Sequence, residues 1–181
     1  NITNVNCHSM NFRTVYISLG SNLGNREARL KEGIRELEDF MVERKAIKSI
    51  TLSPIYETDA WGMKEGTPAF LNQVIALETD LTLSVLLKAL LETETICGRK
   101  REISSEENIY SSRTLDLDIL LDGDTILKTQ ELEVPHPRMT ERRFVLQPLA
   151  DLDPEMQIPG KGCTVGDALE NSPKKPKVRL K

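Results

Sequence analysis

The chain has 181 residues, of which 39% are hydrophobic and 29% are charged, and its formal net charge is −4. This length favours a single domain with an adequate core. The slightly acidic balance does not favour a nucleic-acid partner, whose footprint is a basic face. The sequence shows neither a signal peptide nor an apolar run long enough to span a membrane.

The cysteines indicate the redox environment of the protein, and the composition of the two ends indicates the limits of its domain. Cys7, Cys97 and Cys163 lie far apart, and no metal-ligand spacing joins them, so we expect reduced thiols in a cytoplasmic protein. Residues 1–13 are polar and aperiodic, which is typical of a disordered or artificially added lead-in. We expect one domain over residues 14–170, followed by a solvated basic tail over residues 171–181.

The first half of the chain predicts three strands and one helix. Alternating polarity over residues 14–19 indicates a strand, and helical spacing of apolar residues over 30–41 indicates a helix. A second strand is expected over residues 47–56, with an interruption at its proline. A glycine-containing loop over residues 58–68 precedes a third strand over 70–79.

The second half completes a βαββαβ order. Thr82 is suited to cap a second helix that stops near Gly98, and a polar segment then leads to a fourth strand over residues 113–121. A short hairpin, a helix over 144–149 and a minor helix over 165–169 form a C-terminal extension. This order predicts an α+β, ferredoxin-like fold, in which helices pack on one face of an antiparallel sheet.

The fourth strand carries two carboxylates. Asp116 and Asp118 are two residues apart, so they project from the same face of a strand, roughly 6 to 7 Å apart, while Leu115, Leu117 and Ile119 face the other way. Two such carboxylates are suited to hold hard divalent cations. The alternative is a solvated polar face, but a central strand needs a compensating charge for the pair.

Arginines flank the two carboxylates. Arg99, Arg101 and Arg113 precede them, and Arg138, Arg142 and Arg143 follow. Guanidinium groups bind phosphate oxygens, although any single arginine can equally be solvated or complement a helix dipole. The chain has neither a P-loop nor a Gly-x-Gly-x-x-Gly sequence, so a bound nucleotide would be held by side chains and metal.

Aromatic residues offer a possible platform for a flat ring. Phe70 and Asn72 share one face of the third strand, where an aromatic can stack on a ring and an amide can bond its edge. A core phenylalanine beside an exposed asparagine is the alternative reading. Trp61 lies in the glycine-containing loop and is similarly ambiguous, as is His136 between two prolines.

These segments together resemble the 6-hydroxymethyl-7,8-dihydropterin pyrophosphokinases of folate biosynthesis. The resemblance runs from about Thr14 to about Leu169, and its order and spacing are specific. It is carried by residues 16–24, 56–58, 70–72, 98–101, 112–118, 135–139 and 142–149. One departure is Tyr110-Ser111-Ser112, where the family often has Trp-Gly-Pro.

The resemblance implies a reaction and a set of residues. ATP would give its β,γ-pyrophosphoryl group to the pterin hydroxymethyl oxygen, releasing AMP, with two Mg²⁺ ions held by Asp116 and Asp118. The residues implied to act on ATP and its phosphates are Arg99, Arg101, Arg113, Ile119, His136 and Arg142. Those implied to bind the pterin are Thr58, Asp59, Trp61, Phe70, Asn72 and Phe144.

Two other readings use the same residues. A nucleotidyltransferase would employ the same aspartate pair but release pyrophosphate from ATP. A ligand-binding module without catalysis would bind its ligand whether or not either aspartate is replaced.

Overall fold

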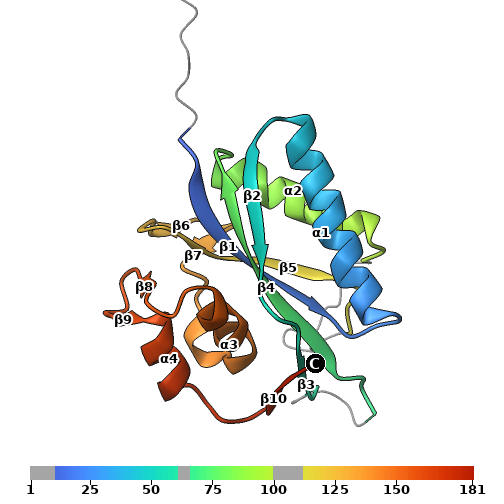
Figure 1. Cartoon of the computed structure of the whole chain (residues 1–181), viewed down its shortest axis with the longest axis vertical. Helices are drawn as coiled ribbons and strands as arrows, with labels where there is room; N and C mark the ends of the chain where they lie inside the picture. The colour runs from blue at the N-terminus through green and yellow to red at the C-terminus, as the bar shows by residue number, and fades with distance from the viewer. Residues whose placement is uncertain (1–10, 61–65, 100–111) are drawn as a thin grey trace, which may run out of the picture.

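The computed structural model of the protein describes residues 11–60, 66–99 and 112–181. Its largest sheet has six antiparallel strands in the order β10-β3-β4-β1-β5, and β2 also pairs with β4 (Figure 1). These strands are β1 (Arg13–Ser21), β2 (Ile47–Leu52), β3 (Tyr56–Thr58), β4 (Phe70–Thr79), β5 (Asp116–Asp122) and β10 (Val178–Leu180).

Four α-helices of the described ranges pack around the sheet. They are α1 (Arg26–Glu43), α2 (Leu83–Ile96), α3 (Arg143–Leu152) and α4 (Val165–Asn171), with a short 3₁₀ helix over Met139–Glu141 before α3. The part of the chain that the structure describes also has two small hairpins: β6 (Leu127–Lys128) with β7 (Glu133–Val134), and β8 (Gln157–Ile158) with β9 (Cys163–Thr164). None of the helices in the described ranges is long and apolar enough to cross a bilayer.

Each long helix begins at a polar cap. Asn25 accepts a hydrogen bond from the backbone N–H of Ala28 at the start of α1, and Thr82 accepts one from Val85 at the start of α2, as its sequence predicts. These bonds satisfy backbone donors that the first helical turn leaves without partners.

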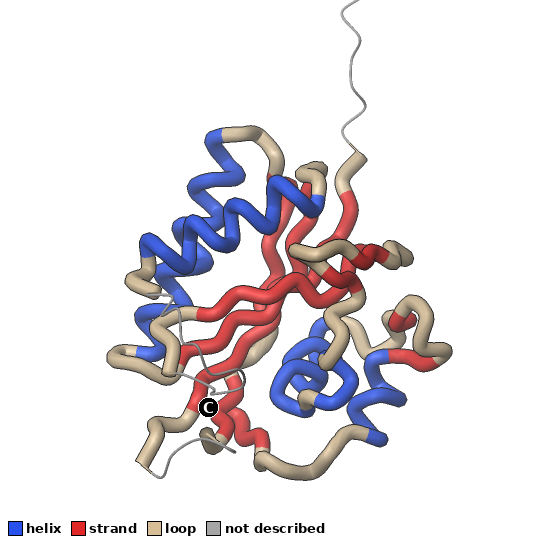
Figure 2. Tube along the Cα trace, turned by 180° about the vertical axis from the view of Figure 1, so that it is seen from behind, coloured by secondary structure: helices blue, strands red, loops and turns tan. Residues whose placement is uncertain are grey.

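The alternation of side chains divides the core between the two faces of the sheet. Val15, Ile17 and Leu19 of β1 lie in a buried cluster with α1 and α2, whereas Tyr16 lies in a second cluster with α3 and α4. Figure 2 shows these two helix pairs on separate sides of the strands. The prediction of helices on one face is therefore correct only for α1 and α2, because the C-terminal extension covers the other face.

A bulge in β5 explains how this strand serves both clusters. Ile17 of β1 pairs with Ile119 and Tyr16 pairs with Leu121, so Leu120 is an extra residue on β5. Both Leu120 and Leu121 consequently join the cluster under α3, and Ile119 stays in the cluster under α1 and α2.

Three further predictions differ in detail from the structure. The strand expected over residues 47–56 is broken into β2 and β3, as its proline indicated. The strand expected from Arg113 begins at Asp116, so Arg113 precedes it. The tail is not solvated throughout, because β10 pairs with β3. The ferredoxin-like assignment and the limits of the domain stay interpretations of this order.

Candidate active site

Asp116 and Asp118 share one face of β5, on the side away from α1 and α2. Their cross-strand partners on β1 are Gly20 for Asp116 and Ser18 for Asp118. The intervening Leu117 is buried in the cluster under α1 and α2, so alternation turns both carboxylates toward the opposite face. The prediction that the two aspartates project together is confirmed.

Two arginines neutralise Asp116. Arg99 Nη1 donates to one carboxylate oxygen at 2.6 Å, and Arg113 Nη1 donates to the other. Arg99 follows α2 and Arg113 precedes β5, so the pairing brings together two segments that are separated in sequence. Each guanidinium has five N–H donors, and therefore retains donors for a second anion.

A buried glutamate contacts both Arg99 and the backbone of β5. Glu94 of α2 is only 2% exposed, and its Oε1 accepts a hydrogen bond of 2.8 Å from the backbone N–H of Leu117 on β5. The same oxygen pairs with Arg99 Nη1. Glu94 thus joins the end of α2 to the strand that carries the aspartates and fixes the position of Arg99. It was not among the candidates from sequence.

Asp118 is compensated less fully than Asp116. Its ion pair among the described residues is with Arg142, whose Nη1 lies 4.0 Å from Oδ2. Burial raises the pKa of Asp118, the charge of Asp116 raises it further, and His136, Arg142 and Arg113 act in the opposite direction. A cation placed here would relieve the repulsion between the two carboxylates.

His136 faces Asp118 from the segment after β7. Its backbone N–H donates to Leu120 at 2.9 Å, and its Nδ1 accepts from the backbone N–H of Arg138 at 3.2 Å. A neutral ring held in this way carries its proton on Nε2. Burial lowers the pKa of His136, although the charge of Asp118 raises it. The neutral ring can therefore donate a hydrogen bond from Nε2.

A pocket of about 300 Å³ opens beside these groups, between α2, β5 and the β6–β7 hairpin. Asp118, Ile119 and His136 line it, together with Leu87, Leu117, residues 129–133 and Pro137. Two of the residues expected to contact ATP, Ile119 and His136, therefore lie at one cavity, with an aspartate expected to bind metal.

A second group of candidates lies on the neighbouring part of the same face. Asn72 of β4 donates through Nδ2 to Thr58 Oγ1 at 2.8 Å, and both side chains are buried. Asn72 pairs across β1 with Gly20, whose other neighbour is Asp116. Since Gly20 has no side chain, the space between the amide and the aspartate is not filled from β1.

The remaining candidates are placed as follows. Phe70 pairs with Thr58 across β3 and β4. Phe144 lies in the first turn of α3, and the guanidinium carbon of Arg142 lies 5.9 Å from its ring centroid. A stack between Phe70 and Phe144 stays a prediction. Asp59 is ion-paired with Arg179 of β10. The candidates Trp61 and Arg101 lie outside the described residues.

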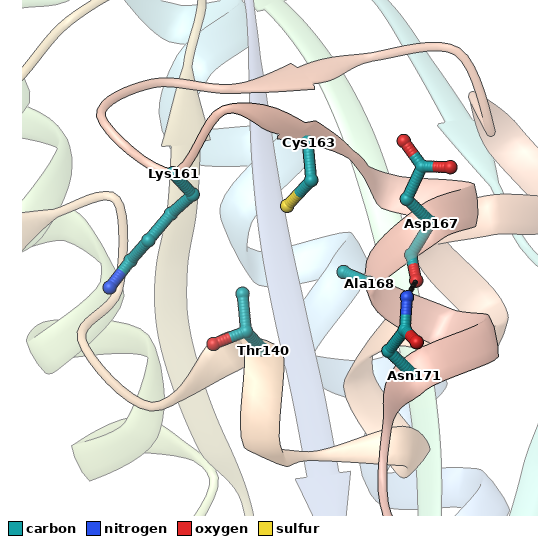
Figure 3. A pocket seen from close by; sticks show the side chains of 6 residues that line it. All are labelled: Thr140, Lys161, Cys163, Asp167, Ala168 and Asn171. Atoms are coloured by element: carbon teal, nitrogen blue, oxygen red, sulfur yellow. Dashed lines mark hydrogen bonds between the residues drawn. The ribbon is translucent and has the colours of Figure 1, made fainter.

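Another hollow, of about 240 Å³, lies over α4 and carries no comparable chemistry (Figure 3). Asp167 accepts from the backbone N–H of Thr164 and Asn171 donates to the carbonyl of Asp167, so both side chains serve the helix itself. Lys161 and Cys163 lie on other sides of the hollow.

Comparison with known proteins gives the family. The sequence model of the 7,8-dihydro-6-hydroxymethylpterin-pyrophosphokinase (HPPK) family matches residues 16–154. The 2-amino-4-hydroxy-6-hydroxymethyldihydropteridine pyrophosphokinase of Pseudomonas aeruginosa is 41% identical over 145 residues, which are 80% of this chain and 83% of the relative. The Bacillus subtilis enzyme of the same name is 41% identical over 76% of each chain.

Longer proteins also contain a similar region. The folic acid synthesis protein fol1 of Pneumocystis carinii is 36% identical over 90% of this chain, which spans only 20% of that protein. A crystal structure of wild-type Plasmodium falciparum HPPK-DHPS with pteroate has a TM-score of 0.62 at 16% identity, covering 88% of this chain and 42% of that one. This last likeness concerns the fold. With the family model matching most of its length and two relatives at 41% identity, the chain belongs to the 7,8-dihydro-6-hydroxymethylpterin-pyrophosphokinase family.

Proposed function

We propose that this member of the pyrophosphokinase family transfers the β,γ-pyrophosphoryl group of ATP to the hydroxymethyl oxygen of 6-hydroxymethyl-7,8-dihydropterin at the face of Asp116 and Asp118. The observation that supports this site best is the cluster of both aspartates with Arg99, Arg113 and Arg142. Paired carboxylates for a metal and guanidinium groups for phosphate oxygens are the parts that phosphoryl transfer needs. A cytoplasmic location fits the free thiols of Cys97 and Cys163.

The nucleotide would enter the pocket of Asp118, Ile119 and His136. Because this pocket adjoins the aspartates, the nucleobase would occupy the cavity while the triphosphate extends over the face that carries the carboxylates. His136 would donate from Nε2 to a phosphate oxygen, and Arg142 lies close enough to Asp118 to meet the same group.

Magnesium fits the donor set. Mg²⁺ in proteins is commonly held by one or two carboxylates together with substrate phosphates, and Asp116 and Asp118 supply the carboxylates. The raised pKa of Asp118, caused by burial and by its acidic neighbour, indicates a site where added positive charge is favourable. When bound, the metal would neutralise phosphate charge and acidify the attacking alcohol.

The pterin would lie across β1 between Asn72 and Asp116. Two strand spacings separate these residues, which is about 10 Å, and a bicyclic ring with a one-carbon arm spans that distance. Asn72 and Thr58 would meet the polar edge of the ring and Phe70 and Phe144 its faces. A ring without the matching donors and acceptors would leave buried polar groups unpaired, and so would be rejected.

The chain's own residues would act by placement and charge. Arg99 and Arg113 would pair with Asp116 and present further N–H donors to the phosphates, while Glu94 keeps Arg99 in place. Holding the alcohol and the phosphate together accounts for a large part of such a rate enhancement.

The direct test supplies ATP, Mg²⁺ and the pterin and identifies the products by mass. AMP with a diphosphorylated pterin is expected. Free pyrophosphate would instead indicate a nucleotidyltransferase, and binding without turnover would indicate a ligand-binding module.

Replacement of either aspartate tests the site itself. Asp116→Asn and Asp118→Asn are each expected to lower turnover by several orders of magnitude, since loss of one ligand misplaces the metal. Asp124→Asn is the matched control, because Asp124 is exposed in the turn after β5. Near-normal rates in both site variants would contradict the assignment.

A further inference from the structure

We propose that strand β10 positions the pterin-binding edge of the sheet, and that Arg179 is a positioning residue for the end of β3 at Thr58 and Asp59. This inference rests on the proposed function, because it concerns the rim of that site. It gives a role in substrate binding to a segment that the sequence indicates only as a basic tail.

The strand β3 depends on its neighbours for its position. It has three residues and pairs with β4 on one side, where Thr58 is opposite Phe70. On its other side all three residues pair with β10, with Val178 opposite Thr58 and Leu180 opposite Tyr56. The backbone N–H of Lys181 extends the contact by donating to the carbonyl of Ile55 at 3.0 Å. β10 therefore makes β3 an internal strand.

The side chain of Arg179 extends this contact past the end of β3 to Asp59. Its Nη1 lies 3.0 Å from Asp59 Oδ1, and its Nη2 lies 2.9 Å from Oδ1 and 3.1 Å from Oδ2. Both side chains are about half exposed, so the pair contributes little to global stability. Its forked geometry is directional, however, and fixes how the carboxylate is turned.

Thr58 and Asp59, which β10 and Arg179 contact, adjoin the groups proposed to bind the ring. Thr58 is 2% exposed and accepts the hydrogen bond of Asn72, so a shift at the end of β3 moves the partner of that amide. Asp59 follows directly, at the start of the loop expected to rim the heterocycle. Arg179 thus acts on the pterin side of the site, whereas the aspartates and the nucleotide pocket are built by β5 and the β6–β7 hairpin.

Loss of the Arg179 side chain should leave the fold intact. β3 keeps its pairing with β4, and Arg26 of α1 still reaches Glu57 at 2.9 Å and the carbonyl of Ala69 at 2.7 Å. An effect of Arg179→Ala on substrate binding can therefore be separated from unfolding.

The experiment compares steady-state constants in Arg179→Ala, Arg179→Lys and Lys177→Ala. Arg179→Ala is expected to raise the KM for the pterin about five-fold, the upper range for an exposed ion pair, with kcat and the KM for ATP nearly unchanged. Arg179→Lys keeps the charge without the fork and should give an intermediate value. Lys177→Ala removes an exposed charge from the same tail and should match the wild type.

Deletion of residues 178–181 tests the strand as a whole. It should raise the pterin KM more than Arg179→Ala does, and hydrogen exchange should accelerate in residues 56–58 while β5 stays protected. A pterin KM in Arg179→Ala equal to that of Lys177→Ala, or equal rises for pterin and ATP, would overturn the inference. Absence of turnover in the wild-type chain would overturn the proposed function and this inference with it.

Discussion

Glu94 is a fully buried charge on a helix, and its partners explain why. Its carboxylate accepts from the backbone of Leu117 and pairs with Arg99, which in turn pairs with Asp116. A buried carboxylate is tolerated when it is paired and hydrogen-bonded, and removal of one partner leaves an unpaired group. The glutamate therefore supports the candidate site from the α2 side of β5.

Glu94→Gln isolates the charge of this residue. The amide oxygen of glutamine can still accept from Leu117, but Arg99 loses one of its anionic partners. Hydrogen bonds to charged groups contribute about 1.5–3 kcal/mol, so we expect turnover to fall roughly 10- to 100-fold. The exposed Glu92 on the same helix provides the control Glu92→Gln, which should leave the rate unchanged. Equal rates in the two variants would show that Glu94 has no role in placing Arg99.

The aspartate pair could be predicted from sequence because its signal is local. Alternation along one strand is enough to put Asp116 and Asp118 on the same face, and the structure agrees. The partners of these aspartates depend on how α2 packs against β5, which no short motif records. A signal for Glu94 was nevertheless present, because Leu86, Leu90 and Glu94 are spaced by four residues and continue the buried face of the helix.

At the scale of elements, α1 packs closely on the segment that precedes β5. Gly33 is buried in α1, and a Cβ atom at this position would lie 2.5 Å from Leu115 Cδ2. Leu115 is fully buried and immediately precedes Asp116. The absence of a side chain at Gly33 thus allows the helix to pack directly over the residue that precedes β5.

Gly33→Ala should consequently destabilise the protein. Alanine favours a helix by roughly 0.5–1 kcal/mol over glycine, but overpacking of a core costs about 1–3 kcal/mol. We expect a net loss of about 1 kcal/mol, which lowers Tm by roughly 2–4 °C for a chain of this size, together with reduced turnover. Lys31→Ala on the exposed side of α1 is the control and should not lower Tm. A higher Tm in Gly33→Ala would contradict the close packing.

The elements that sequence reasoning missed are those defined by long-range pairing. In α1, α2 and β1 the apolar residues repeat at the spacing of a helix or a strand within the segment itself. The positions of these elements could therefore be predicted. β10 has a polar, lysine-rich context and becomes a strand only because β3 offers it an edge. The start of β5 after Arg113 likewise reflects a tertiary contact, because the backbone N–H of Arg113 donates to Asn22 Oδ1 at 2.7 Å.

At the scale of the whole molecule, two tyrosines fasten the sheet to α3 and the residues after it. Tyr16 of β1 donates to Asp153 at 3.2 Å, and Tyr56 of β3 donates to Asp151 at 2.6 Å. Burial and the neighbouring aspartate raise the pKa of each tyrosine to about 12. Both hydroxyls therefore stay protonated at pH values where an unfolded chain ionises them.

This difference predicts a loss of stability at high pH. Below pH of about 10 the tyrosines are neutral in both states, and between about 10 and 12 only the unfolded state loses its protons. The contribution of these groups should decline across that window. Urea unfolding at several pH values measures the slope, which should be smaller in Tyr16→Phe than in the wild type. An identical slope would mean that Tyr16 titrates normally in the folded protein.

The proposed site combines residues from two parts of the fold. Arg142 immediately precedes α3 and Phe144 lies in its first turn, while the aspartates belong to β5, so the site requires the C-terminal extension to dock on the sheet. Leu146 of α3 and Leu37 of α1 are both essentially inaccessible and lie in the two opposite core clusters. Substitution of either by alanine should cost about 2–5 kcal/mol through lost packing. At a temperature where both variants remain folded, only Leu146→Ala should raise the KM for ATP, because only that cavity loosens the helix carrying Arg142. A similar rise in Leu37→Ala would show that general loss of stability, rather than docking of α3, governs nucleotide binding.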